Sequence, residues 1–140
     1  LTTANAVKVV VGAGDSVMAS TATTNTFVDT IAGFTSTTDT ISFGGPVGSA
    51  ANFAAATTAA GATADFAASL AKVDAAADTA LTATVKYAAI TVGVETTYTA
   101  DNGKTYLIYD TDGDGDYTAG TDAIVLLATA TTFAFGDIVI

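Results

Sequence analysis

The stretch that decides the fold is residues 104–127, which read KTYLIY (104–109), DTDGDGDYTAGTD (110–122) and AIVLL (123–127). The first and last parts are β-branched, aromatic or apolar, and each has the length of a short strand. The middle part is acidic, rich in glycine and free of any apolar run. The sequence therefore predicts two strands joined by an acidic loop, and not a helix-loop-helix unit.

The acidic loop has the ligand spacing of a calcium-binding loop. Asp110, Asp112 and Asp114 alternate with small residues, so a tight turn can bring three carboxylates inward. Gly115 relieves the backbone at the sharpest bend, and the next residue supplies a backbone carbonyl at position seven. The predicted metal ligands are Asp110, Asp112, Asp114, Asp116 and Asp122.

The closing position of the loop departs from the calcium-loop pattern. Position twelve is Thr121, and Asp122 comes one residue later, so a longer loop or a water would have to fill the gap. The alternative is a solvated acidic turn without an ion, in which crowded carboxylates repel one another. The chain contains no His and no Cys. The remaining oxygen ligands favour Ca²⁺ over zinc or copper.

Three further aspartates are weaker metal-ligand candidates. Asp15 ends the run GAGD (12–15), which is either a plain turn or a single relic of a glycine-rich calcium-binding repeat. Asp29 and Asp39 each begin an Asp-Thr-Ile run, ten residues apart. Each of these two is either a calcium ligand or a carboxylate that caps a turn.

Composition excludes several classes of partner. The net charge is -10, with 14 acidic residues against 4 basic ones. Nucleic acid is therefore not expected as a partner, and neither is an anionic membrane surface. Every apolar run ends well short of the ~18 residues that span a bilayer, so no membrane insertion is expected. Without Cys there is no disulfide framework, and a bound ion would supply stability instead.

The rest of the chain predicts strands around an alanine-rich centre. Strands are expected in residues 7–11, on both sides of a turn in 26–43, in 82–92 and at the end in 132–140. A hairpin of 95–100 with 104–109 is expected around Asp101-Asn102-Gly103. The two chain ends, 7–11 and 138–140, are apolar enough for central strands that are buried on both faces.

The alanine-rich centre predicts one or two short helices. Thr63 is the expected N-cap, with Asp65 in the first turn, and a shorter helix is expected over residues 51–60. The fold class is therefore mostly β, either a β-sandwich or a sheet-plus-helix, in one domain over residues 1–140, with the calcium loop between strands. The apolar face of the main helix consists of Phe66, Leu70, Val73 and Ala77, and we expect it to pack against a sheet; the alternative is a binding surface for a partner.

With these segments laid out, the chain resembles the C-terminal domains of RTX-type (repeats-in-toxin) calcium-binding proteins that bacteria export by type I secretion, including surface-layer (S-layer) and adhesin proteins. The resemblance rests on FVDTIAGF (27–34) with DTISF (39–43), on residues 106–127, and on the ending FGDIVI (135–140). It implies an extracellular or cell-surface bacterial protein that folds on meeting calcium and carries an uncleaved, apolar C-terminal secretion signal. The tandem glycine-rich repeat array of that family is missing here.

The function expected from these features is structural. There is no His base, no Cys nucleophile and no Gly-x-Ser-x-Gly elbow, so the chain is not expected to be an enzyme. The expectation is a calcium-stabilised domain that acts in S-layer assembly, or as a C-terminal cap and secretion module. The alternative is a filament subunit in which residues 7–11 or 133–140 complete a neighbour's sheet. Expected partners are other copies, in a lattice or filament, or the rest of a larger secreted protein.

Overall fold

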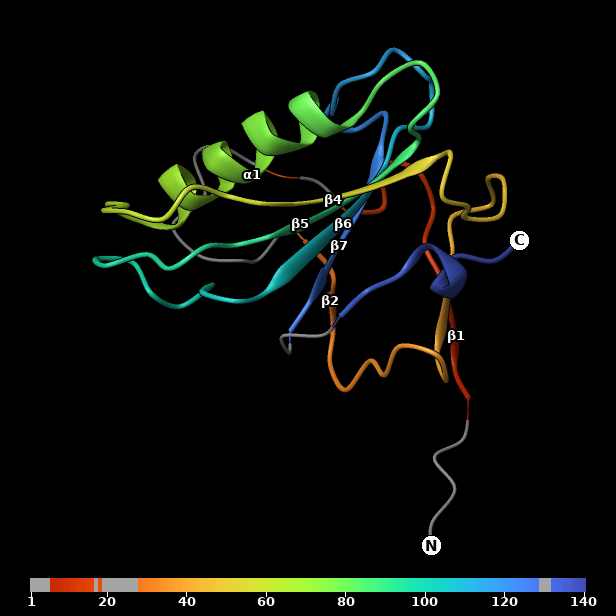
Figure 1. Cartoon of the computed structure of the whole chain (residues 1–140), viewed down its shortest axis with the longest axis horizontal. Helices are drawn as coiled ribbons and strands as arrows, with labels where there is room; N and C mark the ends of the chain where they lie inside the picture. The colour runs from red at the N-terminus through yellow and green to blue at the C-terminus, as the bar shows by residue number, and fades with distance from the viewer. Residues whose placement is uncertain (1–5, 17, 19–27, 129–131) are drawn as a thin grey trace, which may run out of the picture.

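The computed structural model describes residues 6–16, 18, 28–128 and 132–140. A five-stranded sheet in the order β2-β7-β6-β5-β4 forms the centre, and helix α1 (Phe66–Ala80) lies across one of its faces (Figure 1). A two-stranded sheet and a short 3-10 helix, Phe135–Asp137, lie on the other side. The fold is mostly β, and of the two predicted forms it is the sheet-plus-helix. The strands are β1 (Lys8–Val10), β2 (Thr30–Ile31), β3 (Thr40–Ser42), β4 (Phe53–Thr57), β5 (Tyr87–Thr91), β6 (Thr105–Tyr109) and β7 (Ala123–Leu127).

The three central strands of the large sheet are covered on both faces. β6 pairs antiparallel with both β5 and β7, whereas β4 joins β5 and β2 joins β7 in parallel. Side chains on one face of these strands pack against α1, and those on the other face pack against the small sheet and the C-terminal segment. This double burial explains why β7 reads as a continuous apolar run, without alternation of polar and apolar residues.

The predicted helix face is confirmed, because Phe66, Leu70, Val73 and Ala77 are all buried against the sheet. The predicted N-cap is wrong. The carboxylate of Asp65, and not the hydroxyl of Thr63, accepts the N–H of Ala68 at 2.9 Å. The helix begins at Phe66, so only the residue directly before it can reach that N–H. No helix in the described part of the chain has the length and apolar character to span a membrane.

The shorter helix expected over residues 51–60 is also wrong. Phe53–Thr57 is strand β4, which pairs in parallel with β5. Alanine has a high helix propensity, but propensity alone is a weak guide to the final structure. A run of four or five residues gains more from a ladder of hydrogen bonds to a neighbouring strand than from an isolated turn of helix.

The expected hairpin of residues 95–100 with 104–109 does not form. β6 pairs with β5 instead, and residues 95–100 make only the isolated bridge of Glu95 to Gly61. The turn itself is present, since the N–H of Lys104 donates to the carbonyl of Asp101 at 2.9 Å. The side-chain amide of Asn102 exchanges two hydrogen bonds with the backbone of Glu95, which folds this segment into a compact loop.

The two chain ends differ from the expected central strands. β1 is an edge strand of the small sheet. Val7, directly before it, and Val10, its last residue, are 52% and 71% exposed. At the C-terminus, only Ile138 makes a bridge, to Ile41 of β3, and a 3-10 helix precedes it. Of the strands expected in residues 26–43, β2 and β3 form in the described part but belong to different sheets; residues 26 and 27 lie outside the described residues.

Candidate metal centre

The acidic loop, residues 110–122, joins β6 to β7 beside the C-terminal end of α1 (Figure 1). Tyr109 and Ala123 are opposite each other in the antiparallel ladder. Asp110 and Asp122 directly follow and precede this pair, so the ladder holds their backbones side by side. Both aspartates are buried, at 1% and 0% exposure. The strand pairing therefore brings together two carboxylates that are twelve positions apart in the sequence.

The side chain of Asp110 shapes the first half of the loop. Its two carboxylate oxygens accept the N–H groups of Gly113, at 2.6 Å, and Gly115, at 3.2 Å. Both glycines have positive φ angles, 82° and 93°, that residues with a Cβ rarely adopt. The expectation that Gly115 lies at a sharp bend is met, and Gly113 is a second such bend.

The side chain of Asp122 closes the second half of the loop. One of its oxygens accepts the N–H of Thr111 and the other accepts the N–H of Thr118, both at 2.7 Å. The carboxylate thus reaches back across the loop even though it comes one residue after the usual closing position. Asp122, one residue later, therefore brings a carboxylate to the end of the loop where Thr121 has none.

Asp112 completes a group of three. One carboxylate oxygen from each of Asp110, Asp112 and Asp122 lies within 4.8 Å of the others. Two oxygens that bind one Ca²⁺ at 2.3–2.6 Å are at most about 5 Å apart, so a single ion can contact all three. Each carboxylate has about four acceptor positions, so hydrogen bonds to backbone N–H groups leave room for a metal. The donor set is hard oxygen, which suits Ca²⁺.

Burial makes the ionised form of Asp122 costly. Loss of water raises the pKa of Asp122 above its usual value, the hydrogen bonds from Thr118 and Thr111 lower it, and the charges of Asp112 and Asp110 raise it again. The hydrogen bonds do not cancel the other two effects. A cation at this point would remove the repulsion that raises the pKa.

Lys86 is a charged neighbour of the group of three that sequence reasoning did not place here. Its Nζ lies 3.5 Å from Oδ2 of Asp110, and its carbonyl accepts the N–H of Asp110 at 2.9 Å. The lysine precedes β5, and the antiparallel pairing of β5 with β6 puts it beside Asp110. The sequence analysis paired residues 104–109 with 95–100 and not with β5, so it could not place Lys86 beside Asp110. One ammonium at this distance offsets part of the charge of three carboxylates, and it would compete with any metal for Asp110.

Asp114 and Asp116 lie outside the group of three, and both are exposed. Asp114 accepts the N–H of Asp116 at 3.2 Å, and a hydrogen bond between their side chains is the main cause that raises the pKa of Asp116. On α1, the pKa of Asp74 is raised by burial, then by Asp78 and Asp116. Asp78 accepts the N–H of Tyr117 at 3.1 Å. These side chains form a second acidic group between the loop and the helix.

Two of the three weaker candidates cap turns. The carboxylate of Asp15 accepts the N–H of Gly12 at 2.9 Å, as in a plain turn. The carboxylate of Asp39 accepts the N–H groups of Val7 and Thr35, at 3.0 and 2.8 Å. Neither belongs to the acidic group that could hold a metal among the described residues.

The third, Asp29, lies away from that group too, and its backbone holds β2 in place. Its carbonyl accepts the N–H of Leu126 at 2.8 Å, and its N–H donates to Ser16 at 2.7 Å. The turn at residues 12–15 contacts the acidic loop, because the N–H of Gly14 donates to the carbonyl of Asp122 at 3.3 Å. This contact gives the GAGD turn a supporting role at the end of the loop.

Comparison of the chain with protein-family models, with curated proteins and with solved structures finds no match. The resemblance to RTX-type domains therefore stays a prediction from the sequence.

Proposed function

We propose that residues 110–122 bind one Ca²⁺ and that the chain is a calcium-stabilised extracellular structural domain of a bacterial surface protein. The observation that carries this proposal is the approach of Asp110, Asp112 and Asp122 to within 4.8 Å, with the first and last buried. Carboxylates this close repel one another when they are ionised, and a bound cation would remove that repulsion. In the described part of the chain, Lys86, at 3.5 Å from Asp110, is the one ion-pair partner of these three.

Calcium binding would make stability depend on the surroundings. An ion that binds only the folded chain adds RT ln(1 + [L]/Kd), which is about 2.7 kcal/mol when calcium is at 100 times its Kd. Extracellular calcium is in the millimolar range, where even weak extracellular calcium modules are filled. A chain without disulfides would gain its stabilising crosslink only after it leaves the cell.

Within that class, the role we propose is S-layer assembly, or a C-terminal cap and type I secretion module, as the RTX resemblance implies. The partners are then other copies or the rest of a larger secreted protein. The second candidate is a filament joined by exchange of residues 7–11 or 133–140. Both segments have pairing partners inside the chain, β1 with β3 and Ile138 with Ile41, so exchange would first break those contacts.

Calorimetric titration with Ca²⁺ tests the site, with Mg²⁺ as the competing ion and Asp112→Asn and Asp116→Asn as a matched pair. Both residues are exposed aspartates of the same loop, but only Asp112 belongs to the group of three. We expect one site in the wild type, a calcium Kd raised at least about tenfold by Asp112→Asn, and a change of less than about threefold in Asp116→Asn.

Thermal unfolding in calcium and in chelator gives the second readout. The wild-type melting temperature should fall in chelator, and the difference should nearly vanish in Asp112→Asn. Absence of a calcium-dependent shift in the wild type would overturn the proposal. Equal loss of affinity in both variants would indicate diffuse attraction of cations to an acidic surface, without a defined site.

A further inference from the structure

Strand β4 is the outer strand of the large sheet, and one side of its backbone is open. Alternate residues of a strand point their N–H and C=O groups to opposite sides. The carbonyl of Asn52 accepts the N–H of Tyr87, and the N–H of Thr58 donates to Thr91, both at 2.9 Å. Even-numbered residues therefore face β5. Three odd-numbered residues point their backbone groups away from the sheet, and no described segment pairs with them: Phe53, Ala55 and Thr57.

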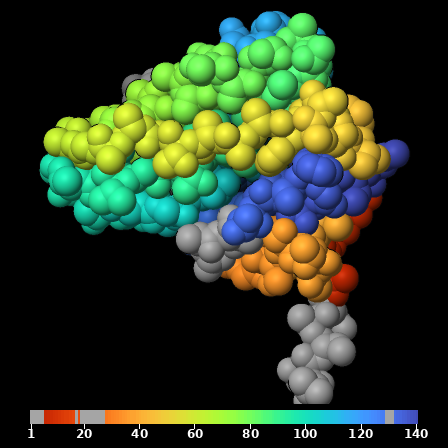
Figure 2. Space-filling model, in the orientation of Figure 1, coloured from red at the N-terminus to blue at the C-terminus, as the bar shows by residue number. Residues whose placement is uncertain are grey.

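This edge lacks the features that normally prevent strands from pairing between molecules. Natural edge strands carry charges, bulges or proline, or lie under another segment. Residues 40–64 contain no charged side chain, although the net charge of the chain is -10, and Pro46 lies outside β4. Figure 2 shows β4, in yellow, as an uncovered ridge on this face of the molecule. The opposite edge, β2, has only two residues and offers much less to a partner.

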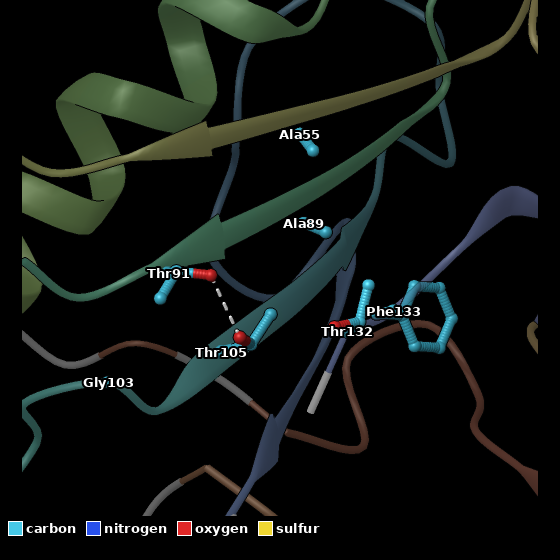
Figure 3. A pocket seen from close by; sticks show the side chains of 7 residues that line it. All are labelled: Ala55, Ala89, Thr91, Gly103, Thr105, Thr132 and Phe133. Carbon is cyan, nitrogen blue, oxygen red and sulfur yellow. Dashed lines mark hydrogen bonds between the residues drawn. The ribbon is translucent and has the colours of Figure 1, made fainter. Parts of the chain in front are cut away.

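A pocket of about 370 Å³ lies beside the open edge. Its floor comes from small side chains on three adjacent strands: Ala55 of β4, Ala89 and Thr91 of β5, and Thr105 of β6 (Figure 3). Thr91 and Thr105 share a hydrogen bond of 2.9 Å, in which one hydroxyl donates to the other. An added strand would find backbone partners at the edge and room for one large side chain next to it.

We propose that the β4 edge is a self-association surface, on which β4 of a second copy adds antiparallel about a two-fold axis, with Ala55 opposite Ala55. In this register Phe53, Ala55 and Thr57 of each copy donate and accept one backbone hydrogen bond each. Phe53 of the second copy comes opposite Thr57, beside the pocket. The alanines at 54, 55 and 56 allow the two strands to meet without steric conflict.

Charge favours a second copy in this antiparallel arrangement. Most of the surface of one copy repels another, whereas the neutral edge does not. The acidic loop lies at the end of the sheet where β4 begins, because Phe53 is level with Tyr87 and Tyr87 with Tyr109. Antiparallel pairing therefore puts the acidic loops of the two copies at opposite ends of the joined sheet. The contact involves one short strand, so the dimer is weak and forms at high local concentration.

Sedimentation of the full chain between about 10 μM and 1 mM, in calcium and in chelator, measures the association. We expect a monomer–dimer equilibrium in both solutions, because the edge does not include the acidic loop. Association in calcium alone, or a monomer at about 1 mM in both solutions, would overturn the proposal. The calcium titration does not depend on this result, so the two proposals fail separately.

Two edge variants and one control locate the contact. Ala55→Pro removes an outward N–H, which an edge strand tolerates, and Thr57→Lys adds a charge to the edge. Ala75→Lys makes the same charge change as Thr57→Lys, on an exposed position of α1. We expect the dimer Kd to rise at least about tenfold in both edge variants and less than about threefold in the control. If Ala55→Pro does not fold, the dimer Kd of Thr57→Lys alone tests the proposed contact.

Hydrogen exchange of the wild type supplies an independent readout. With rising protein concentration, the amides of Ala55 and Thr57 should exchange more slowly, whereas those of Ala54 and Ala56 already bond to β5 and should not change. Dimerisation without this alternation would place the contact elsewhere and overturn the proposal.

Discussion

The loops at the two ends of β6 both contain buried acidic groups, but they neutralise them in different ways. At one end, Glu95 has a side chain that is 1% exposed, and Lys72 contacts it at 2.9 Å. Asp101, also buried, is 2.9 Å from Lys104. Thr63 donates a further hydrogen bond to Glu95. Each carboxylate at this end has its own lysine.

At the other end, three carboxylates share Lys86, which is 3.5 Å from the nearest of them. Their remaining hydrogen bonds come from backbone N–H groups, which orient the carboxylates but bring no net charge. The comparison teaches that burial of an acidic group does not by itself indicate a metal site. A shortage of neighbouring lysines is the feature that supports the proposed site. If that proposal holds, the stability of one end of β6 is independent of calcium in the solution and that of the other end depends on it.

The largest expected effect comes from breaking the lysine-neutralised end. Lys72→Met leaves Glu95 buried without its ion pair and should lower the free energy of unfolding by about 2 kcal/mol, after allowance for the partial exposure of Lys72. Because both members of the ion pair belong to the chain and neither is in the acidic loop, the loss of stability should be the same in calcium and in chelator. Urea unfolding in the two solutions measures it, and Lys72→Met with Glu95→Gln should recover part of the loss. A loss confined to chelator would contradict the comparison.

A smaller and opposite pair of effects is expected at the acidic loop. Lys86→Met removes the ammonium that is 3.5 Å from Asp110. In chelator the free energy of unfolding should fall by up to about 1 kcal/mol, whereas the affinity for Ca²⁺ should rise severalfold, because the metal no longer competes with the lysine. Urea unfolding and calorimetric titration measure the two quantities. Weaker calcium binding in this variant would show that Lys86 supports the site.

The smallest effect concerns Asp74, whose neighbours Asp78 and Asp116 have no lysine partner among the described residues. Burial and these neighbours raise the pKa of Asp74 in the folded chain. Between the unfolded and folded pKa values, the folded state then holds more protons, so stability falls as the pH rises through that range.

Asp74→Asn should therefore stabilise the domain at pH 7 by less than about 1 kcal/mol, and the gain should fade towards pH 4. Chemical unfolding from pH 4 to 7 in chelator is the measurement. A pH profile for Asp74→Asn that runs parallel to the wild type would show that Asp74 does not contribute.

The sequence by itself determined the features that depend on neighbouring residues. The period-3.6 pattern of Phe66, Leu70, Val73 and Ala77 gave the buried helix face, and the apolar runs beside residues 110–122 gave β6 and β7. The alternation of aspartate with small residues gave an ordered turn, since an aspartate bonds the backbone of the next few residues.

Only the tertiary structure decided the features that depend on residues far apart in the chain. Phe53–Thr57 is a strand because β5 lies beside it, although its alanines also suit a helix. Asp122 closes the loop and Lys86 stands beside Asp110 because β6 pairs with both β7 and β5. Local preferences are worth a few tenths of a kcal/mol per residue, whereas a shared ladder and a buried face act on whole strands, so the long-range pairing prevails.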